Sequence, residues 1–214
     1  MLPEPCLCLV TDSTLVKDDL MERVVAAVRG GVDLVQLREK DLPGGQLLDL
    51  STGLLQALDG RAKLIINERA DVALVAGADG VQLGERGLPV AAARKALGGQ
   101  ALIGRSVHSP DSAERAERDS ASFLVVGTMF ASRSHPGEEP EGPELMAQIA
   151  GLCRLPLIGI GGITPDNAAQ VIDAGASGVA VITNILAAGD PHAAAARLKK
   201  VLMASWSARA STGR

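Results

Sequence analysis

The sequence predicts a single α/β domain with a closed (β/α)8 barrel, the TIM-barrel fold. Eight short segments rich in Val, Leu and Ile alternate with helical stretches, which is typical of parallel strands joined by right-handed crossovers. Aromatic residues number only three among 214 (Trp206, Phe123 and Phe130), so aliphatic side chains must build the core, as in parallel sheets covered by helices. A doubly wound open sheet is the alternative, but no Gly-x-Gly-x-x-Gly fingerprint follows the first strand.

The expected strands are short, apolar and rich in β-branched residues or Leu. Glycines at the ends of several helical stretches fit helix C-caps that lead into the next strand. The strands are expected at Leu7–Thr11, Asp33–Leu37, Lys63–Ile66, Gly80–Leu83, Leu102–Arg105, Phe123–Val126, Leu157–Ile160 and Gly178–Ile182. Helical stretches are expected at Asp18–Arg29, Gln46–Leu58, Ala70–Ala76, Pro89–Leu97, Pro110–Asp119, Asp166–Ala174 and Asp190–Ala204.

The chain is expected to divide into an N-terminal extension (1–6), the barrel (7–204) and a flexible tail (205–214). Residues Ala131–Pro143 are dense in Pro, Gly and Glu, which predicts a mobile loop over the site. The chemistry of such a barrel belongs at the carboxyl ends of its strands.

Composition excludes several classes of protein. A net charge of −4 with few aromatic residues argues against a nucleic-acid surface. No apolar run approaches the length of a membrane span, and the N-terminus lacks the features of a signal peptide. Three cysteines in apolar segments predict reduced core thiols rather than a disulfide or metal site. We therefore expect a cytoplasmic protein, and a homodimer as the commonest soluble assembly.

The segment Pro156–Asn167 predicts a phosphate site. An apolar run stops at Gly161 and Gly162, and Thr164 with Pro165 indicates the start of a helix. Glycines allow close approach of the backbone to a ligand, and amides at a helix start attract anions. The segment Gly178–Asn184 repeats the pattern one strand later, with Ile182 and Thr183 at its polar end. The alternative is two ordinary strand–helix turns.

The second strand ends in a Gln-x-Arg-x-Lys pattern at Gln36, Arg38 and Lys40. Side chains two apart share a face, and cations facing a barrel interior require an anionic partner. Arg offers a planar fork for phosphate or carboxylate, and Lys a mobile point charge. The alternative is a structural ion pair with one of the carboxylates that follow the neighbouring strands: Glu39, Glu68 and Glu85.

Other strand ends also carry polar residues. Asn67 and Glu68 follow the third strand, and Gln82 ends the fourth. Ser106 near the end of the fifth strand is equally a ligand or a helix cap, a role that Asp111 could also fill. A lone histidine such as His108 is more often structural, and His135 lies in the predicted loop, where solvent exposure is the default.

Seven of these segments together resemble the thiamine phosphate synthase superfamily over roughly residues 7 to 200. Each motif is weak alone, but their order and spacing make the resemblance specific. They are Gln36–Lys40 (Gln-Leu-Arg-Glu-Lys), Ile65–Asn67 (Ile-Ile-Asn), Ala78–Gly84 (Ala-Asp-Gly-Val-Gln-Leu-Gly), Ile103–His108 (Ile-Gly-Arg-Ser-Val-His), Val126–Phe130 (Val-Gly-Thr-Met-Phe), Gly159–Ile163 (Gly-Ile-Gly-Gly-Ile) and Gly178–Thr183 (Gly-Val-Ala-Val-Ile-Thr).

The resemblance implies a (β/α)8 barrel in thiamine biosynthesis with one of two activities. The synthase joins hydroxymethylpyrimidine diphosphate to a thiazole phosphate, with Mg²⁺ and basic residues drawing off pyrophosphate before the thiazole nitrogen attacks. The tautomerase aromatises a carboxythiazole phosphate and needs no metal. By motif, Gln36, Arg38 and Lys40 would contact the pyrimidine diphosphate with help from Asn67, and Ser106 would lie by the reacting groups. The thiazole phosphate would lie on Gly161, Gly162, Ile182 and Thr183.

The chain departs from both patterns. Synthases usually carry Asn-Asp after the third strand, where this chain has Asn67 and Glu68, and an Asp magnesium ligand where it has Gly87. Glu68, or a displaced Glu85, would have to hold the metal. The lysine of a synthase loop is matched here by His135, which is only partly cationic near neutrality; Arg133 could compensate for it.

The segments around Gln82 and His108 are similar to the tautomerase branch. That branch typically has a histidine after the sixth-strand glycine, where this chain has Thr128, so His108 or His135 would have to move the proton. The missing magnesium Asp at Gly87 and the Arg-Ser-Val-His stretch that ends at His108 favour a thiazole tautomerase-like enzyme without cofactor. The alternatives are a thiamine phosphate synthase that uses Mg²⁺, and a non-catalytic thiazole phosphate binder or regulator.

Overall fold

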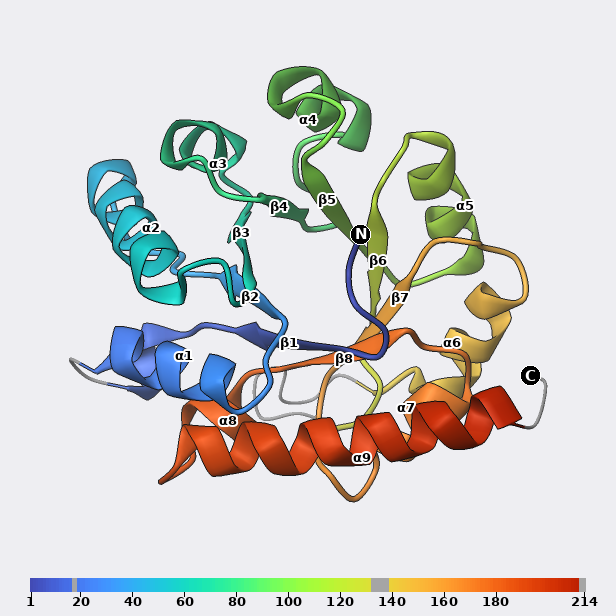
Figure 1. Ribbon diagram of the computed structural model, residues 1–214. Helices are drawn as coiled ribbons and strands as arrows, with labels where there is room; N and C mark the ends of the chain where they lie inside the picture. The colour runs from blue at the N-terminus through green and yellow to red at the C-terminus, as the bar shows by residue number, and fades with distance from the viewer. Residues whose placement is uncertain (17–18, 132–138, 212–214) are drawn as a thin grey trace.

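A computed structural model describes residues 1–16, 19–131 and 139–211 of the chain. Eight parallel strands pair in chain order, and the first strand closes the barrel by pairing with the last (Figure 1). Helices surround the strands in Figure 1, as right-handed crossovers require. The predicted single-domain (β/α)8 fold is confirmed.

The strands lie close to their expected positions. The main difference is the fifth strand, which continues past Arg105 to Val107 and so includes Ser106. The strands are β1 (Cys6–Val10), β2 (Leu34–Leu37), β3 (Lys63–Asn67), β4 (Gly80–Leu83), β5 (Leu102–Val107), β6 (Phe123–Val126), β7 (Leu157–Ile160) and β8 (Gly178–Val181).

The helices of the described residues also follow the expected order, with three additions to the expected set: the 3₁₀ turn η1, α6 and the short α8. α6 starts inside the segment expected to be a loop; most of that segment lies outside the described residues. The helices are η1 (Ser13–Leu15, a 3₁₀ turn), α1 (Leu20–Arg29), α2 (Gly44–Leu58), α3 (Ala70–Ala76), α4 (Val90–Leu97), α5 (Pro110–Arg118), α6 (Gly142–Ala150), α7 (Ala168–Asp173), α8 (Thr183–Leu186) and α9 (Pro191–Ser211).

Alternation along each strand divides the core into two parts. In β1, Leu7 and Leu9 pack outward in the large cluster between strands and helices. Cys6, Cys8 and Val10 face the barrel interior, in a smaller cluster that also contains residues of β2, β3, β6, β7 and β8. The interior is therefore a packed apolar core, and the polar residues must gather above it, at the carboxyl ends of the strands.

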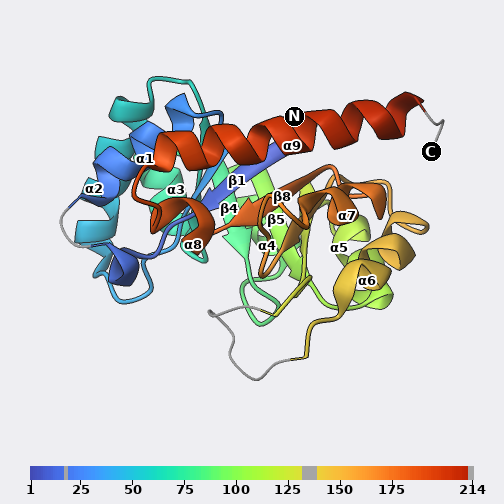
Figure 2. The ribbon, with the colours of Figure 1, turned by 90° about the horizontal axis from the view of Figure 1, so that it is seen from below.

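The two ends of the chain pack against the barrel. Leu2, in the expected N-terminal extension, is buried in the interior cluster. The flexible tail expected from residue 205 is wrong over residues 205–211, where α9 continues. α9 packs along α1, α8 and α7 (Figure 2), and Arg209 donates to the carbonyls of Ile172 and Ala176 while lying 4.2 Å from the Trp206 ring centroid. These tertiary contacts hold a polar segment helical.

The three cysteines are free and buried, as expected for reduced core thiols. Burial raises the pKa of Cys6 to about 12 and raises the pKa of Cys8 well above its usual value. None of the helices in the described ranges combines the length and apolar character that crossing a membrane requires.

Candidate active site

Four consecutive strands end in polar side chains joined in two pairs. Gln36 of β2 donates through Nε2 to Oδ1 of Asn67 on β3, over 2.9 Å. Gln82 of β4 donates through Nε2 to Oγ of Ser106 on β5, over 3.1 Å. Both glutamines are buried, at 6% and 2% exposure, whereas Asn67 and Ser106 are half-buried. Because inward residues one layer lower are apolar, these pairs form the polar floor of the barrel mouth.

The cations that follow β2 lie in a loop rather than on the strand. β2 ends at Leu37, so the expected strand ladder stops after Gln36; Arg38 is half-buried and Lys40 is exposed. The ion-pair alternative is not seen, because neither cation has a carboxylate within salt-bridge distance in the described part of the chain. Unbalanced positive charge next to a buried polar floor suits an anionic ligand.

Glu39, between the two cations, anchors the loop. It is 8% exposed, and its carboxylate accepts from Thr11 Oγ1 at 2.5 Å and from the Ser13 amide at 3.0 Å. Thr11 Oγ1 in turn accepts from the Arg38 amide at 2.9 Å. The network commits Glu39 to the β1–α1 loop and fixes the backbone that carries Arg38. This role was not predicted from the sequence, where Glu39 was considered only as an ion-pair partner of the neighbouring cations.

Glu68 reaches across to the loop after β4. Its backbone is left-handed, with φ of 62°, an uncommon conformation for a residue with a side chain. Its Oε1 accepts from the Gly84 amide at 2.6 Å, and a Cβ built on Gly87 would overlap Oε2. The carboxylate thus lies in the space that a side chain at position 87 would fill. Glu85 is exposed, and Arg105 holds its backbone carbonyl at 2.7 Å.

A cavity of about 300 Å³ opens beside this loop, between α4 and α5. Gly87 and Ser106 line it, and its charged lining consists of two arginines and two carboxylate residues: Arg105, Arg115, Glu85 and Asp119. Arg105 donates to two backbone carbonyls, that of Leu88 at 3.1 Å and that of Glu85 at 2.7 Å.

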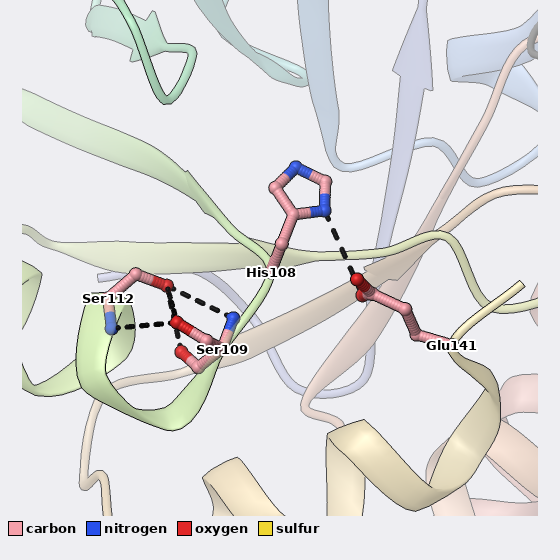
Figure 3. Close-up of polar contacts among 4 residues, drawn as sticks. All are labelled: His108, Ser109, Ser112 and Glu141. Carbon is pink, nitrogen blue, oxygen red and sulfur yellow. Dashed lines mark hydrogen bonds and ion pairs between the residues drawn. The ribbon is translucent and has the colours of Figure 1, made fainter. Parts of the chain in front are cut away.

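His108 lies at the mouth opposite Glu141, as Figure 3 shows. Their Nδ1 and Oε2 atoms are 3.8 Å apart, which makes an ion pair when the imidazole is protonated. The cap of α5 is Ser109, in a reciprocal capping box with Ser112, so neither Ser106 nor Asp111 serves as the cap. Ser106 is instead held by Gln82. Glu141 was not predicted from the sequence, because its contact with His108 joins segments distant in the chain.

The two glycines after β7 lie against the loop that follows β6. Both have positive φ, 105° at Gly161 and 61° at Gly162, which favours glycine. A Cβ on Gly161 would overlap Thr128 Cγ2, and one on Gly162 would overlap the Ala131 carbonyl oxygen. Thr128 is half-buried, and its carbonyl accepts from the Glu141 amide at 2.9 Å. The glycines are therefore required by the backbone as well as by any ligand.

The helix expected directly after these glycines starts later, at Ala168. Asn167 closes the intervening turn: its Oδ1 accepts from the Thr164 amide at 2.8 Å and its Nδ2 donates to the Gly162 carbonyl at 3.0 Å. α7 therefore begins two residues after the expected Asp166, although the Ala168 amide already donates to the Thr164 carbonyl at 3.0 Å, a helical bond that starts at Thr164. The role of Asn167 was not predicted from the sequence, although an Asn before a helix is a common cap.

The end of β8 completes the mouth. Ile182 packs at the edge of the barrel interior and Thr183 begins the four-residue helix α8. Thr183 and Asn184 are half-buried there. His135, the remaining predicted site residue, lies outside the described residues.

Comparison with known proteins gives a consistent result. Residues 7–185 match the family described as thiamine monophosphate synthase. A thiamine-phosphate synthase of Natronomonas pharaonis is 44% identical over 181 residues, covering 83% of this chain and 85% of that protein. One of Moorella thermoacetica is 43% identical over 184 residues, covering 85% and 88%. A solved thiamine phosphate pyrophosphorylase of Pyrococcus furiosus superposes with a TM-score of 0.86 at 32% identity, covering 94% of this chain and 96% of that one.

Proposed function

Because the chain belongs to the thiamine monophosphate synthase family, we propose that it joins hydroxymethylpyrimidine diphosphate to a thiazole phosphate and releases pyrophosphate. It is an enzyme of thiamine biosynthesis, of the transferase class. The closer likeness to the tautomerase branch, which the sequence motifs favour, is not confirmed, since these relatives are named as synthases. Their names support the alternative that the sequence left open.

The observation that carries the proposal is that two cations and a turn with two glycines lie at one mouth, both of which suit a phosphate. Arg38 and Lys40 supply uncompensated positive charge on one side, and the backbone around Gly161, Gly162 and Thr183 offers a close approach on the other. A reaction between two phosphorylated substrates requires two such features, and the polar floor lies among the strands that carry them.

In the proposed reaction the bond between the pyrimidine methylene carbon and the diphosphate oxygen breaks, and its electron pair leaves with pyrophosphate. The thiazole nitrogen then forms a bond to that carbon with its own lone pair, giving the thiazolium product. Arg38 and Lys40 would bind the leaving pyrophosphate, on which negative charge accumulates. Gln36 and Asn67 would orient the pyrimidine above the apolar core.

The magnesium ion that the family implies is compatible with these residues. Mg²⁺ is commonly bound through one or two carboxylates together with substrate phosphates. In the described residues, no three His, Cys, Asp or Glu side chains gather into a metal-binding group, but Glu68 places one carboxylate in the space left by Gly87. Glu68 would therefore hold Mg²⁺ jointly with the diphosphate. When bound, the ion would neutralise charge on the departing pyrophosphate.

The test is an assay of the purified protein with pyrimidine diphosphate and the aromatic thiazole phosphate, with and without Mg²⁺. We expect magnesium-dependent formation of thiamine phosphate and of one pyrophosphate per product. The non-aromatic carboxythiazole phosphate, offered alone, is the control: its conversion without coupling would support the tautomerase reaction instead. Binding of thiazole phosphate without turnover of either substrate would contradict both enzymatic reactions.

A further inference from the structure

The Gln82 side chain is one of the buried polar groups of the barrel mouth. It is 2% exposed, and its Nε2 donates both to Ser106 Oγ at 3.1 Å and to the Leu83 carbonyl at 3.3 Å. Its Oε1 is the only fully buried side-chain nitrogen or oxygen among the described residues without a hydrogen-bond partner. A buried acceptor without a partner carries an uncompensated desolvation cost, so its presence in the site requires an explanation.

The Leu83 carbonyl fixes which end of the amide faces Ser106. If the amide were turned over, Oε1 would face the Leu83 carbonyl oxygen at the same 3.3 Å, placing two acceptors together. The orientation with Nε2 towards Leu83 and Ser106 avoids this repulsion. Ser106 Oγ must therefore act as an acceptor towards Gln82.

This arrangement determines the direction of the Ser106 hydroxyl proton. Among the described residues no acceptor receives that proton, and Ser106 is half-buried at the mouth rather than sealed. We propose that Gln82 is a positioning residue, which holds Ser106 Oγ from below so that its O–H donates to the oxygen of the departing diphosphate. This inference rests on the proposed synthase function.

Gly104 leaves room for the arrangement. It precedes Ser106 by two residues on β5 and so points into the same interior; a Cβ built there would overlap Gln82 Oε1 and the Phe123 ring. Any side chain at 104 would push the amide away from Ser106. The absence of a side chain at Gly104 thus makes room for the Gln82 amide.

In the neighbouring pair, Gln36 and Asn67, the glutamine is again the hydrogen-bond donor. Gln36 donates to Asn67 Oδ1, which leaves the Asn67 Nδ2 donors, like the Ser106 hydroxyl, without a partner in the described residues. In both pairs the glutamine thus occupies the acceptor oxygen of its partner, and the partner's own donor stays available to a ligand. Donors of this kind suit an oxygen that gains negative charge during the reaction, and such donors act most strongly in a water-excluded site.

A double-mutant cycle tests the proposal. Gln82→Met keeps side-chain length and apolar packing but removes the donor, and Ser106→Ala removes the hydroxyl. We expect Gln82→Met to lower kcat about 10- to 100-fold in the wild-type background, with a smaller change in KM, because the hydroxyl interaction strengthens in the transition state. In the Ser106→Ala background the same change should lower kcat less than about twofold. Thermal unfolding of all four proteins checks that each is folded.

The outcomes separate this inference from the proposed function. Equal effects of Gln82→Met in both backgrounds would show that Gln82 acts through packing alone and would overturn the inference, while wild-type coupling activity still supported the synthase. Absence of coupling activity in the wild type would overturn the proposed function itself. If Gln82→Met unfolds, Gly104→Ala serves as the second variant, since it displaces the amide without removing it, and the same non-additivity with Ser106→Ala is expected.

Discussion

The two halves of the barrel mouth present different chemistry to a ligand. Strands β2–β5 end in side chains: a polar floor of paired amides and hydroxyl, with Arg38 and Glu68 above it. The turns after β6–β8 instead present backbone, with Gly161 and Gly162 in conformations that favour glycine.

In the β2–β5 half a substitution can therefore change ligand binding without changing stability. In the β6–β8 half a substitution changes both. A side chain in the β2–β5 half can be removed without altering the backbone that carries it, because Arg38, for example, is positioned through its amide by Thr11. In the β7 turn the ligand-facing group is the backbone itself, so a substitution changes binding and stability together. Substitutions in each half test that distinction.

Removing the Arg38 guanidinium should have the largest effect on activity. We expect Arg38→Ala to lower kcat/KM of the coupling reaction about 10²- to 10³-fold, because a charged donor to the leaving pyrophosphate is lost. The free energy of unfolding should stay within about 0.5 kcal/mol of wild type. Arg29→Ala is the matched control: Arg29 is exposed in the last turn of α1, at the opposite end of the barrel. Similar activity of both variants would remove Arg38 from the mechanism.

A side chain at position 162 should impair stability and binding together. In Gly162→Ala the added Cβ meets the Ala131 carbonyl at a φ of 61°, so we expect a loss of about 1–3 kcal/mol in unfolding free energy and weaker binding of thiazole phosphate. Urea unfolding and calorimetric titration measure the two effects. Gly99→Ala is the control, because Gly99 is exposed with open space around it. If Gly162→Ala weakened binding but kept the unfolding free energy of the wild type, a change of backbone conformation could not be the common cause of both effects.

Glu68 allows a test of the metal contact that does not depend on turnover. We expect Glu68→Gln to weaken Mn²⁺ binding in the presence of pyrophosphate about tenfold, measured by the loss of the free Mn²⁺ signal in electron paramagnetic resonance. The substituted side chain retains an oxygen for the Gly84 amide, so stability should change little. Equal Mn²⁺ binding by the Glu68→Gln variant and the wild type would place the metal on other residues.

The ion pair between Arg69 and Asp71, at the start of α3, should give the smallest effect. Hydrogen bonding to Arg69, 2.6 Å from the carboxylate, lowers the pKa of Asp71 to about 2. The folded-state pKa lies below the ordinary value, so the stabilisation is present above pH 3.8 and is lost as pH falls towards about 2. Because both side chains are largely exposed, we expect Asp71→Asn to cost under about 1 kcal/mol at pH 7. The difference from wild type, measured by urea unfolding, should shrink below about pH 4; a constant difference would exclude the ion pair as its origin.

The barrel, its eight strands and the residues at the strand ends could be predicted from the amino-acid sequence. Local pattern is sufficient for this, because each strand is a short apolar run and each helix start or end has its own signals. Gln36, Asn67, Gln82 and Ser106 could be identified as candidates from position alone. The helix α9 beyond residue 204 could not, since contacts of Arg209 with Ile172 and Ala176 hold it.

The hydrogen-bond and ion-pair partners of these candidates depend on the folded barrel. The direction of the Gln82–Ser106 hydrogen bond, the pairing of His108 with Glu141 and the position of Glu68 over Gly87 each join segments well separated in the chain. Their geometry depends on the register between neighbouring strands and on the paths of the loops. The residues next to each candidate in the sequence do not indicate the strand register or the loop paths. The barrel brings these segments together only when it closes.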